Sequence, residues 1–142
     1  MIKVLVQSSV LFSAALSPAG GSRQILNLAQ QKRIYTFNSQ DIIDEVKEHL
    51  QEDYPEYLNQ FEDFIQNYNL AIHPPLSQED VLLFKEGYIQ DKGDAHVVAV
   101  AAKLEIDFLI SLDKKHFLQN IKLAKKLNIR IVSPGEFLQE MF

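Results

Sequence analysis

The chain has 142 residues, of which 46% are hydrophobic and 23% charged, and its formal net charge is −5. This size and composition are ordinary for one globular domain. The absence of cysteine excludes disulfides, zinc–thiolate sites and a thiol nucleophile, and no apolar run reaches the ~18 residues that span a bilayer. We therefore expect one cytoplasmic domain over residues 1–142, with a mature N-terminus and no membrane partner.

The first half of the chain alternates between strand and helix patterns. Residues 2–6 are a β-branched apolar run of the kind that a buried parallel strand needs, and a second short strand is predicted over residues 33–37. A break at residues 18–21 precedes Ser22, which can cap a first helix, and Ser39 can cap a second. The apolar positions of these helices have helical spacing: Ile25, Leu26 and Leu28, then Ile42, Ile43, Val46 and Leu50.

A third helix, predicted over residues 54–68, is rich in aromatic residues. Its apolar stripe consists of Tyr57, Leu58, Phe61, Phe64, Ile65 and Tyr68. Such a stripe could stack on a cofactor or on RNA, but packing in the core or in a dimer is its more common role. A short strand at residues 70–72 and a helix-capping signal at residues 77–80 follow.

The last third of the chain has the clearest pattern. A helix of small residues is predicted over residues 94–104, a strand over 108–110, a basic helix over 115–127 and a strand over 129–132. A capping box at residues 133–136 opens the final helix. Strands that alternate with helices imply a mainly parallel sheet of about five strands, covered by helices on both faces, in a single α/β domain.

Four acidic residues, Glu45, Asp91, Asp94 and Asp113, lie where one site could collect them, and the neutral Gln7 ends the first strand beside them. Asp113 follows the fourth strand, and Glu45 lies about two turns into the helix after the second strand. Asp94 begins the helix that leads to the fourth strand, and Asp91 comes just before it. Ligands of parallel sheets bind beyond the carboxyl ends of the strands, so these groups converge if the first and fourth strands are neighbours.

A cluster of carboxylates is suited to Mg²⁺ or Mn²⁺, since both ions prefer oxygen ligands. Each acid also has a simpler explanation: Asp94 as a helix cap, Asp113 as a turn residue, Glu45 as one of many acids in its helix. Their joint placement favours a metal site. The histidines have no zinc-site spacing, and no glycine-rich loop follows the first strand, which argues against a nucleotide-binding domain.

Basic residues gather after Asp113. Residues 114–130 hold six lysine and arginine residues and no acid. A block of this kind is usually a solvated helix face, but it can also contact phosphates. The candidate RNA-binding residues are Lys114, Lys115, Lys122, Lys125 and Lys126.

Five short motifs follow one another along nearly the whole chain. They are the strand end and apolar segment of residues 6–18, Ser39 with Glu45, Asp91 with Asp94 before a small apolar helix, Ser111 with Asp113 after a strand, and Pro-Gly-Glu-Phe-Leu at residues 134–138. In this order the motifs resemble the PIN domain family. Its members are metal-dependent ribonucleases that include many toxin components of toxin–antitoxin pairs.

The resemblance implies a role for each matching residue. Glu45, Asp94 and Asp113 would be the catalytic carboxylates that hold Mg²⁺ or Mn²⁺, and Asp91 would assist as a fourth ligand. Ser111 would orient a ligand or the attacking water. The implied fold is a PIN-like three-layer α/β/α domain, and the implied reaction is in-line attack of metal-bound water on an RNA phosphodiester.

The chain departs from the family at the first strand, where the family's Asp is Gln7 and its Asn is Ser9, both expected to line the site. A glutamine offers a neutral carbonyl oxygen and an amide donor, so Gln7 supplies neither charge for the metal nor a base. Two interpretations follow: a PIN-type ribonuclease of the toxin kind, or a catalytically impaired PIN-fold protein that binds RNA or a protein. The expected partners are RNA, an antitoxin-like protein and a second copy of the chain.

Overall fold

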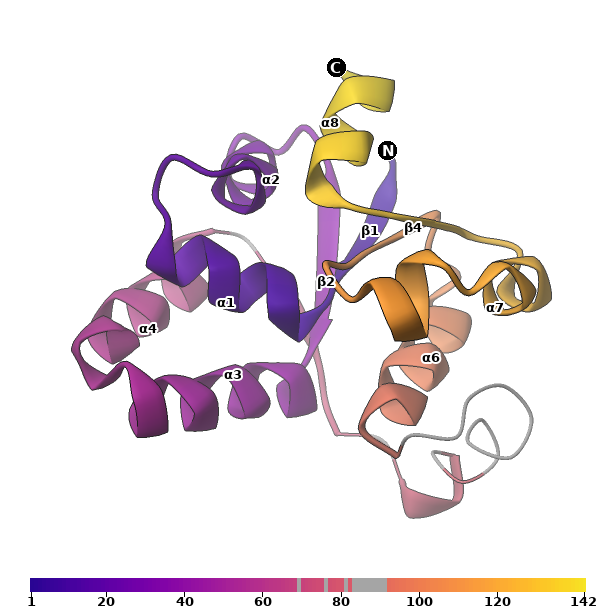
Figure 1. Cartoon of the computed structure of the whole chain (residues 1–142), viewed down its shortest axis with the longest axis horizontal. Helices are drawn as coiled ribbons and strands as arrows, with labels where there is room; N and C mark the ends of the chain where they lie inside the picture. The colour runs from indigo at the N-terminus through magenta and orange to yellow at the C-terminus, as the bar shows by residue number, and fades with distance from the viewer. Residues whose placement is uncertain (69, 76, 81, 83–91) are drawn as a thin grey trace.

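The computed structural model describes residues 1–68, 70–75, 77–80, 82 and 92–142. Its centre is a five-stranded sheet in the order β3-β2-β1-β4-β5, in which all neighbouring strands are parallel (Figure 1). The strands are β1 (Lys3–Val6), β2 (Tyr35–Ser39), β3 (Ala71–His73), β4 (Phe108–Ile110) and β5 (Arg130–Val132). The predicted parallel sheet and single α/β domain are therefore confirmed.

Helices cover the sheet. In Figure 1, the helices between β1 and β3 lie on one side of β1 and β2, and the helix that leads to β4, α6 (Lys92–Leu104), lies on the other side. This arrangement is the predicted three-layer α/β/α domain. The helical elements are α1 (Ser8–Leu16), α2 (Gly21–Gln30), α3 (Gln40–Asp53), η1 (Pro55–Tyr57), α4 (Leu58–Asn67), α6 (Lys92–Leu104), η2 (Lys114–Leu118), α7 (Ile121–Leu127) and α8 (Pro134–Met141).

Two of the predicted helix caps are present. The Ser39 hydroxyl accepts from the Ile42 backbone N–H at 3.1 Å, which places the start of α3 directly after β2. At α8, Ser133 and Glu136 form the reciprocal capping box. The apolar residues predicted for α3 are buried, and Phe61 and Phe64 of α4 pack in the core, as expected for the aromatic stripe.

Other boundaries differ from the predictions. Gly20, not Ser22, is the N-cap residue of α2, and Ser22 is buried in the first turn. The second strand begins at Tyr35 rather than at residue 33, because Lys32 takes a positive φ of 60° and the chain is still turning there. From Tyr35 the strand is in register with Lys3 of β1.

Two predicted helices are each divided in two. The segment predicted as residues 54–68 contains the 3-10 turn η1, which begins at Pro55, and then α4. The basic segment predicted as residues 115–127 contains the π-helical turn η2 and then α7. The second division occurs because the Asn120 side chain accepts from the Leu123 N–H at 3.1 Å and so starts a new helix.

The capping signal at residues 77–80 is also present, since the Ser77 hydroxyl accepts from the Asp80 N–H at 3.2 Å. Most of the segment that follows lies outside the described residues. Among the helices that are described, none combines the length and apolar character needed to cross a membrane.

Candidate functional site

The strands β1 and β4 are neighbours at the centre of the sheet, and the chain leaves their carboxyl ends toward opposite edges. Val6 pairs with Ile110, and the Gln7 N–H donates to the Ile110 carbonyl at 3.0 Å. Gln7 and Ser111 therefore meet at the point where the strand order reverses. In parallel sheets this is the place where ligands bind.

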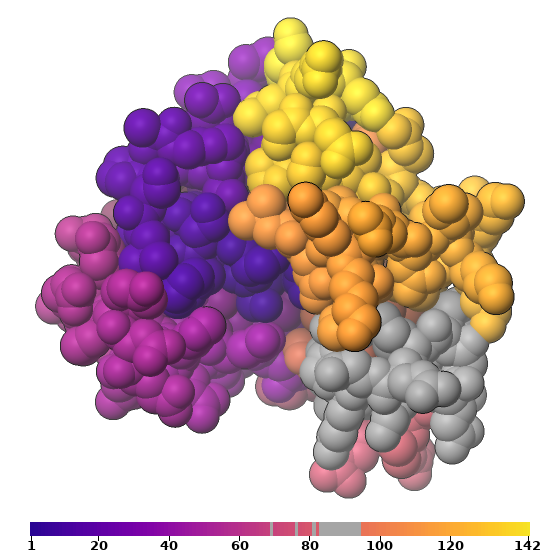
Figure 2. Space-filling view, in the orientation of Figure 1, coloured from indigo at the N-terminus to yellow at the C-terminus, as the bar shows by residue number. Residues whose placement is uncertain are grey.

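A pocket of about 340 Å³ opens there. It brings together the start of α1, the middle of α3 and the start of η2, three segments that meet on the face shown in Figure 2. Of the acids predicted for the site, Glu45 and Asp113 line it. The complete lining is Gln7, Ser8, Ser9, Phe12, Glu45, Val46, His49 and Asp113.

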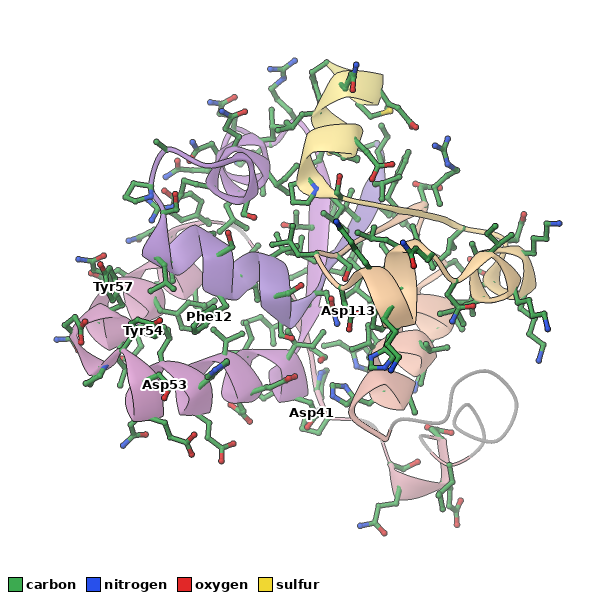
Figure 3. The ribbon with its side chains drawn as sticks, viewed as in Figure 1. Phe12, Asp41, Asp53, Tyr54, Tyr57 and Asp113 are labelled. Atoms are coloured by element: carbon green, nitrogen blue, oxygen red, sulfur yellow. The ribbon has the colours of Figure 1, made fainter. Side chains whose placement is uncertain are left out.

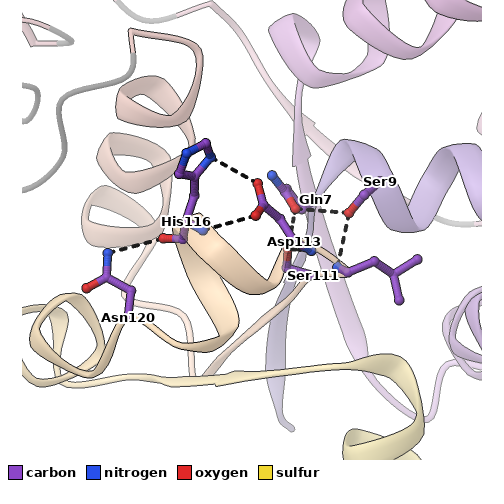
Figure 4. A network of polar contacts seen from close by, with 7 residues as sticks. Gln7, Ser9, Ser111, Asp113, His116 and Asn120 are labelled. Atoms are coloured by element: carbon purple, nitrogen blue, oxygen red, sulfur yellow. Dashed lines mark hydrogen bonds and ion pairs between the residues drawn. The ribbon is translucent and has the colours of Figure 1, made fainter.

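Polar contacts hold the side chain of Gln7 in one orientation (Figure 4). Its Oε1 accepts from the Ser9 hydroxyl at 3.0 Å and from the Ser111 hydroxyl. Each hydroxyl oxygen in turn accepts a backbone N–H: Ser9 from Leu112 at 3.1 Å, and Ser111 from Asp113 at 3.0 Å. Ser111 is thus a buried link between β1 and the loop after β4.

The carboxylate of Asp113 is also fixed. As the N-cap residue of η2, it accepts the His116 N–H on Oδ1 at 3.0 Å, and its Oδ2 lies 3.2 Å from His116 Nδ1. No contact of His116 was predicted from the sequence, although its spacing of three residues from a helix cap was the available signal. The backbone N–H and the ring of His116 therefore both hold this carboxylate.

One wall of the pocket is aromatic, which the sequence did not indicate. The rings of Phe12 and His49 stack with centroids 4.5 Å apart and planes at 16°, and Tyr54 meets the Phe12 edge at 5.8 Å. Figure 3 shows Phe12 and Tyr54 in the space between α1 and α3. His49 also pairs with Asp53 at 3.2 Å. Glu45 and His49 are four residues apart on one face of α3, so both line the pocket.

The remaining predicted site residues lie elsewhere or outside the description. Asp94 is in the first turn of α6, with its side chain outside the described part, and Asp91 is outside the described residues. The five candidate lysines are exposed on η2 and α7. In Figure 1, α7 lies beyond η2, on the side away from α1 and α3, so the lysines nearest the pocket in the chain are those of η2.

The described donor set suits a hard divalent cation, although it is small. Among the described residues, no three histidine, aspartate or glutamate side chains gather as a metal site. Glu45 and Asp113 nevertheless offer carboxylate oxygens to one pocket. Mg²⁺ commonly takes one or two carboxylates together with waters and substrate phosphate, so the residues present fit such an ion.

Residues 3–115 match the model of a family described as the PIN domain. No curated protein matches the chain. Several solved structures share its fold. VapBC2 from Rickettsia felis, bound to a promoter DNA fragment, has a TM-score of 0.64 at 14% identity, with 92% of this chain and 97% of that chain covered.

Two further structures show the same fold. A toxin–antitoxin complex from Klebsiella pneumoniae has a TM-score of 0.65 at 17% identity and covers 92% of this chain and 97% of its own. Mycobacterium tuberculosis VapC20, a Sarcin-Ricin loop cleaving toxin, has a TM-score of 0.59 at 12% identity, with 79% and 91% covered. At these identities the likeness concerns the fold.

Proposed function

The chain belongs to the PIN domain family, and we propose that it is a divalent-metal-dependent ribonuclease, the toxin component of a toxin–antitoxin pair. The observation that carries this proposal is the pocket at the strand reversal. There, Glu45 from α3, Asp113 from the N-cap of η2 and Gln7 from the end of β1 line one pocket. Residues so distant in sequence gather in the place where the fold binds ligands.

The similar structures support the kind of activity. VapC20 is a toxin that cleaves the Sarcin-Ricin loop, and VapBC2 and the Klebsiella complex are toxin–antitoxin assemblies. An RNA substrate also suits the aromatic wall, because unpaired bases stack on aromatic side chains. The exposed lysines of η2, Lys114 and Lys115, follow Asp113 directly and would contact the RNA backbone.

The proposed roles follow from the contacts of each side chain. Glu45 and Asp113 would hold Mg²⁺ or Mn²⁺, with Asp94 and Asp91 as the further ligands that the family motif implies. The cation would polarise the phosphodiester and lower the pKa of a bound water. His116 holds the Asp113 carboxylate toward the pocket, and Ser111 orients Gln7. The ring pair of Phe12 and His49 would hold a base beside the reacting phosphate.

A second function, RNA or protein binding without cleavage, is favoured by one observation. The position of the family's first aspartate holds Gln7, whose carbonyl oxygen already accepts two hydroxyl protons. This side chain brings no negative charge to the pocket. A protein with this composition can keep the surface for RNA while catalysis is lost.

Cleavage of a labelled single-stranded RNA in Mn²⁺, in Mg²⁺ and in EDTA tests the first proposal. We expect cleavage in Mn²⁺ that stops in EDTA and falls at least tenfold in Glu45→Gln. The matched control is Glu48→Gln, because Glu48 is exposed on the same helix but does not line the pocket. If the RNA binds but stays intact in every metal, the chain has the binding function and is not a nuclease. Equal cleavage by both variants would show that Glu45 is not part of the site.

The partners belong to the same proposal. We expect an antitoxin-like protein that binds this chain and suppresses its cleavage, and a homodimer with twice the 16.3 kDa chain mass. Both would act in the cytoplasm, where the RNA is. Light scattering of the purified chain tests the dimer, and a monomer at all concentrations would contradict it.

A further inference from the structure

The amide group of Gln7 has a defined direction, although its two ends are similar in size. The hydroxyl oxygens of Ser9 and Ser111 each accept a backbone N–H, so their own protons are directed at Gln7. Two hydroxyl protons need an acceptor, which is the carbonyl oxygen and not the NH2 group. Oε1 is thus turned into the protein and uses both lone pairs. Among the described residues, none makes a hydrogen bond to Nε2, which is the polar end of Gln7 left for a ligand of the pocket.

The start of α1 adds further donors on the same side of the pocket. Gln7 is the N-cap residue of α1, and its side chain makes no capping hydrogen bond. Its backbone carbonyl accepts the N–H groups of Val10 and Leu11, while Ser8 and Ser9, the first two residues of the helix, line the pocket. The N-terminus of a helix favours a negative charge, because its first N–H groups lack carbonyl partners.

The pocket lining therefore combines two kinds of polar group. Glu45 and Asp113 present carboxylates, whereas Gln7 and the start of α1 present N–H donors. His49 Nε2 is already paired with Asp53, and the Ser9 proton is used on Gln7. Among the described lining residues, the Gln7 amide and the Ser8 hydroxyl are left as side-chain donors. A cation cannot accept a hydrogen bond, whereas the oxygens of a phosphodiester accept hydrogen bonds from such donors.

We propose that Gln7 is a substrate-positioning residue whose Nε2 donates a hydrogen bond to a non-bridging oxygen of an RNA phosphodiester, with the start of α1 beside it. In the family the residue at this position would ligate a cation, whereas in this chain Gln7 would bind the phosphate. This inference rests on the proposed function, because it takes RNA as the ligand. It also gives Gln7 a purpose in an active enzyme and in a binding protein alike.

Fluorescence anisotropy of an end-labelled single-stranded RNA, measured in EDTA, isolates this contact from cation binding. Gln7→Leu removes the donor, and we expect binding at least about tenfold weaker, the low end of the effect of a lost hydrogen bond to a charged group. Gln7→Glu keeps the acceptor for Ser9 and Ser111 and nearly the same shape, but replaces the donor by a negative charge. It should bind more weakly than Gln7→Leu.

Ser13→Ala is the control, since Ser13 lies on α1 but does not line the pocket, and binding should change less than twofold. Thermal melts establish that each variant is folded. Gln7→Asp provides a second readout: it should tighten Mn²⁺ binding and weaken RNA binding in EDTA. Wild-type affinity in both Gln7→Leu and Gln7→Glu would overturn the proposal, as would tighter RNA binding by Gln7→Asp in EDTA.

The outcomes separate this inference from the proposed function. If RNA binding depends on Gln7 but no cleavage occurs in Mn²⁺, the phosphate contact is supported and only the nuclease activity is contradicted. If Gln7→Leu cleaves RNA normally and its RNA affinity is unchanged, only the phosphate contact is contradicted. A wild-type protein that binds no RNA in EDTA or in Mn²⁺ overturns both.

Discussion

Replacing Ser111 with alanine should destabilise the protein by removing the hydroxyl that joins the ends of β1 and β4. Ser111 is fully buried, and its Oγ accepts the Asp113 N–H at 3.0 Å and donates to Gln7 Oε1. Without it, the partly buried Asp113 N–H loses its acceptor, and Gln7 keeps one donor of two. A buried donor left without an acceptor costs about 1–3 kcal/mol, so we expect a loss of roughly 2 kcal/mol in the free energy of unfolding.

For a domain of this size, ~1 kcal/mol corresponds to about 4 °C in the melting temperature, so Ser111→Ala should melt about 8 °C lower. Circular dichroism on heating measures the change. Ser13→Ala is the control, because Ser13 is half-buried within α1 and its side chain has no hydrogen bond in the described structure. It should stay within ~0.5 kcal/mol of the wild type. Equal melting temperatures for the two variants would refute the assignment of Ser111 as a structural link.

Three further changes test separate parts of the structure. Ser39→Ala removes the cap of α3 and should cost about 1 kcal/mol in urea unfolding; an unchanged midpoint would contradict the cap. Phe12→Ala removes the Phe12 ring from the aromatic wall and should weaken single-stranded RNA binding about tenfold in anisotropy; an unchanged affinity would show that no base stacks there. Replacing Lys122, Lys125 and Lys126 together with glutamine should flatten the salt dependence of RNA binding by up to about 2 in slope. The same affinity at low salt would identify α7 as a solvated face.

Much of the fold could be predicted from local patterns. The strand β4 has the predicted bounds, and the caps at Ser39 and Ser133 place the starts of α3 and α8. These features depend on short-range chemistry, because a serine before an apolar helical pattern satisfies free N–H groups wherever it occurs. The meeting of Gln7 and Asp113 also followed, since it needs only that the first and fourth strands be neighbours.

The sequence could not predict features that depend on distant partners. The orientation of the Gln7 amide is determined by Ser111, 104 residues away. The stack of Phe12 on His49 joins two helices, α1 and α3, and α1 itself follows β1 with no capping side chain as a signal. The basic segment was predicted as one helix because its apolar spacing is continuous. That spacing does not show that the Asn120 cap starts a second helix, α7.

Isothermal titration of Mn²⁺ tests the central claim, a shared cation site at this pocket, most directly. We expect weak but measurable binding to the wild type, because Glu45 and Asp113 line the pocket while Gln7 brings no charge. The Asp94→Asn, Asp113→Asn double variant should lose this heat, and Glu48→Gln should retain it. Identical heats for the wild type and the double variant would contradict the site.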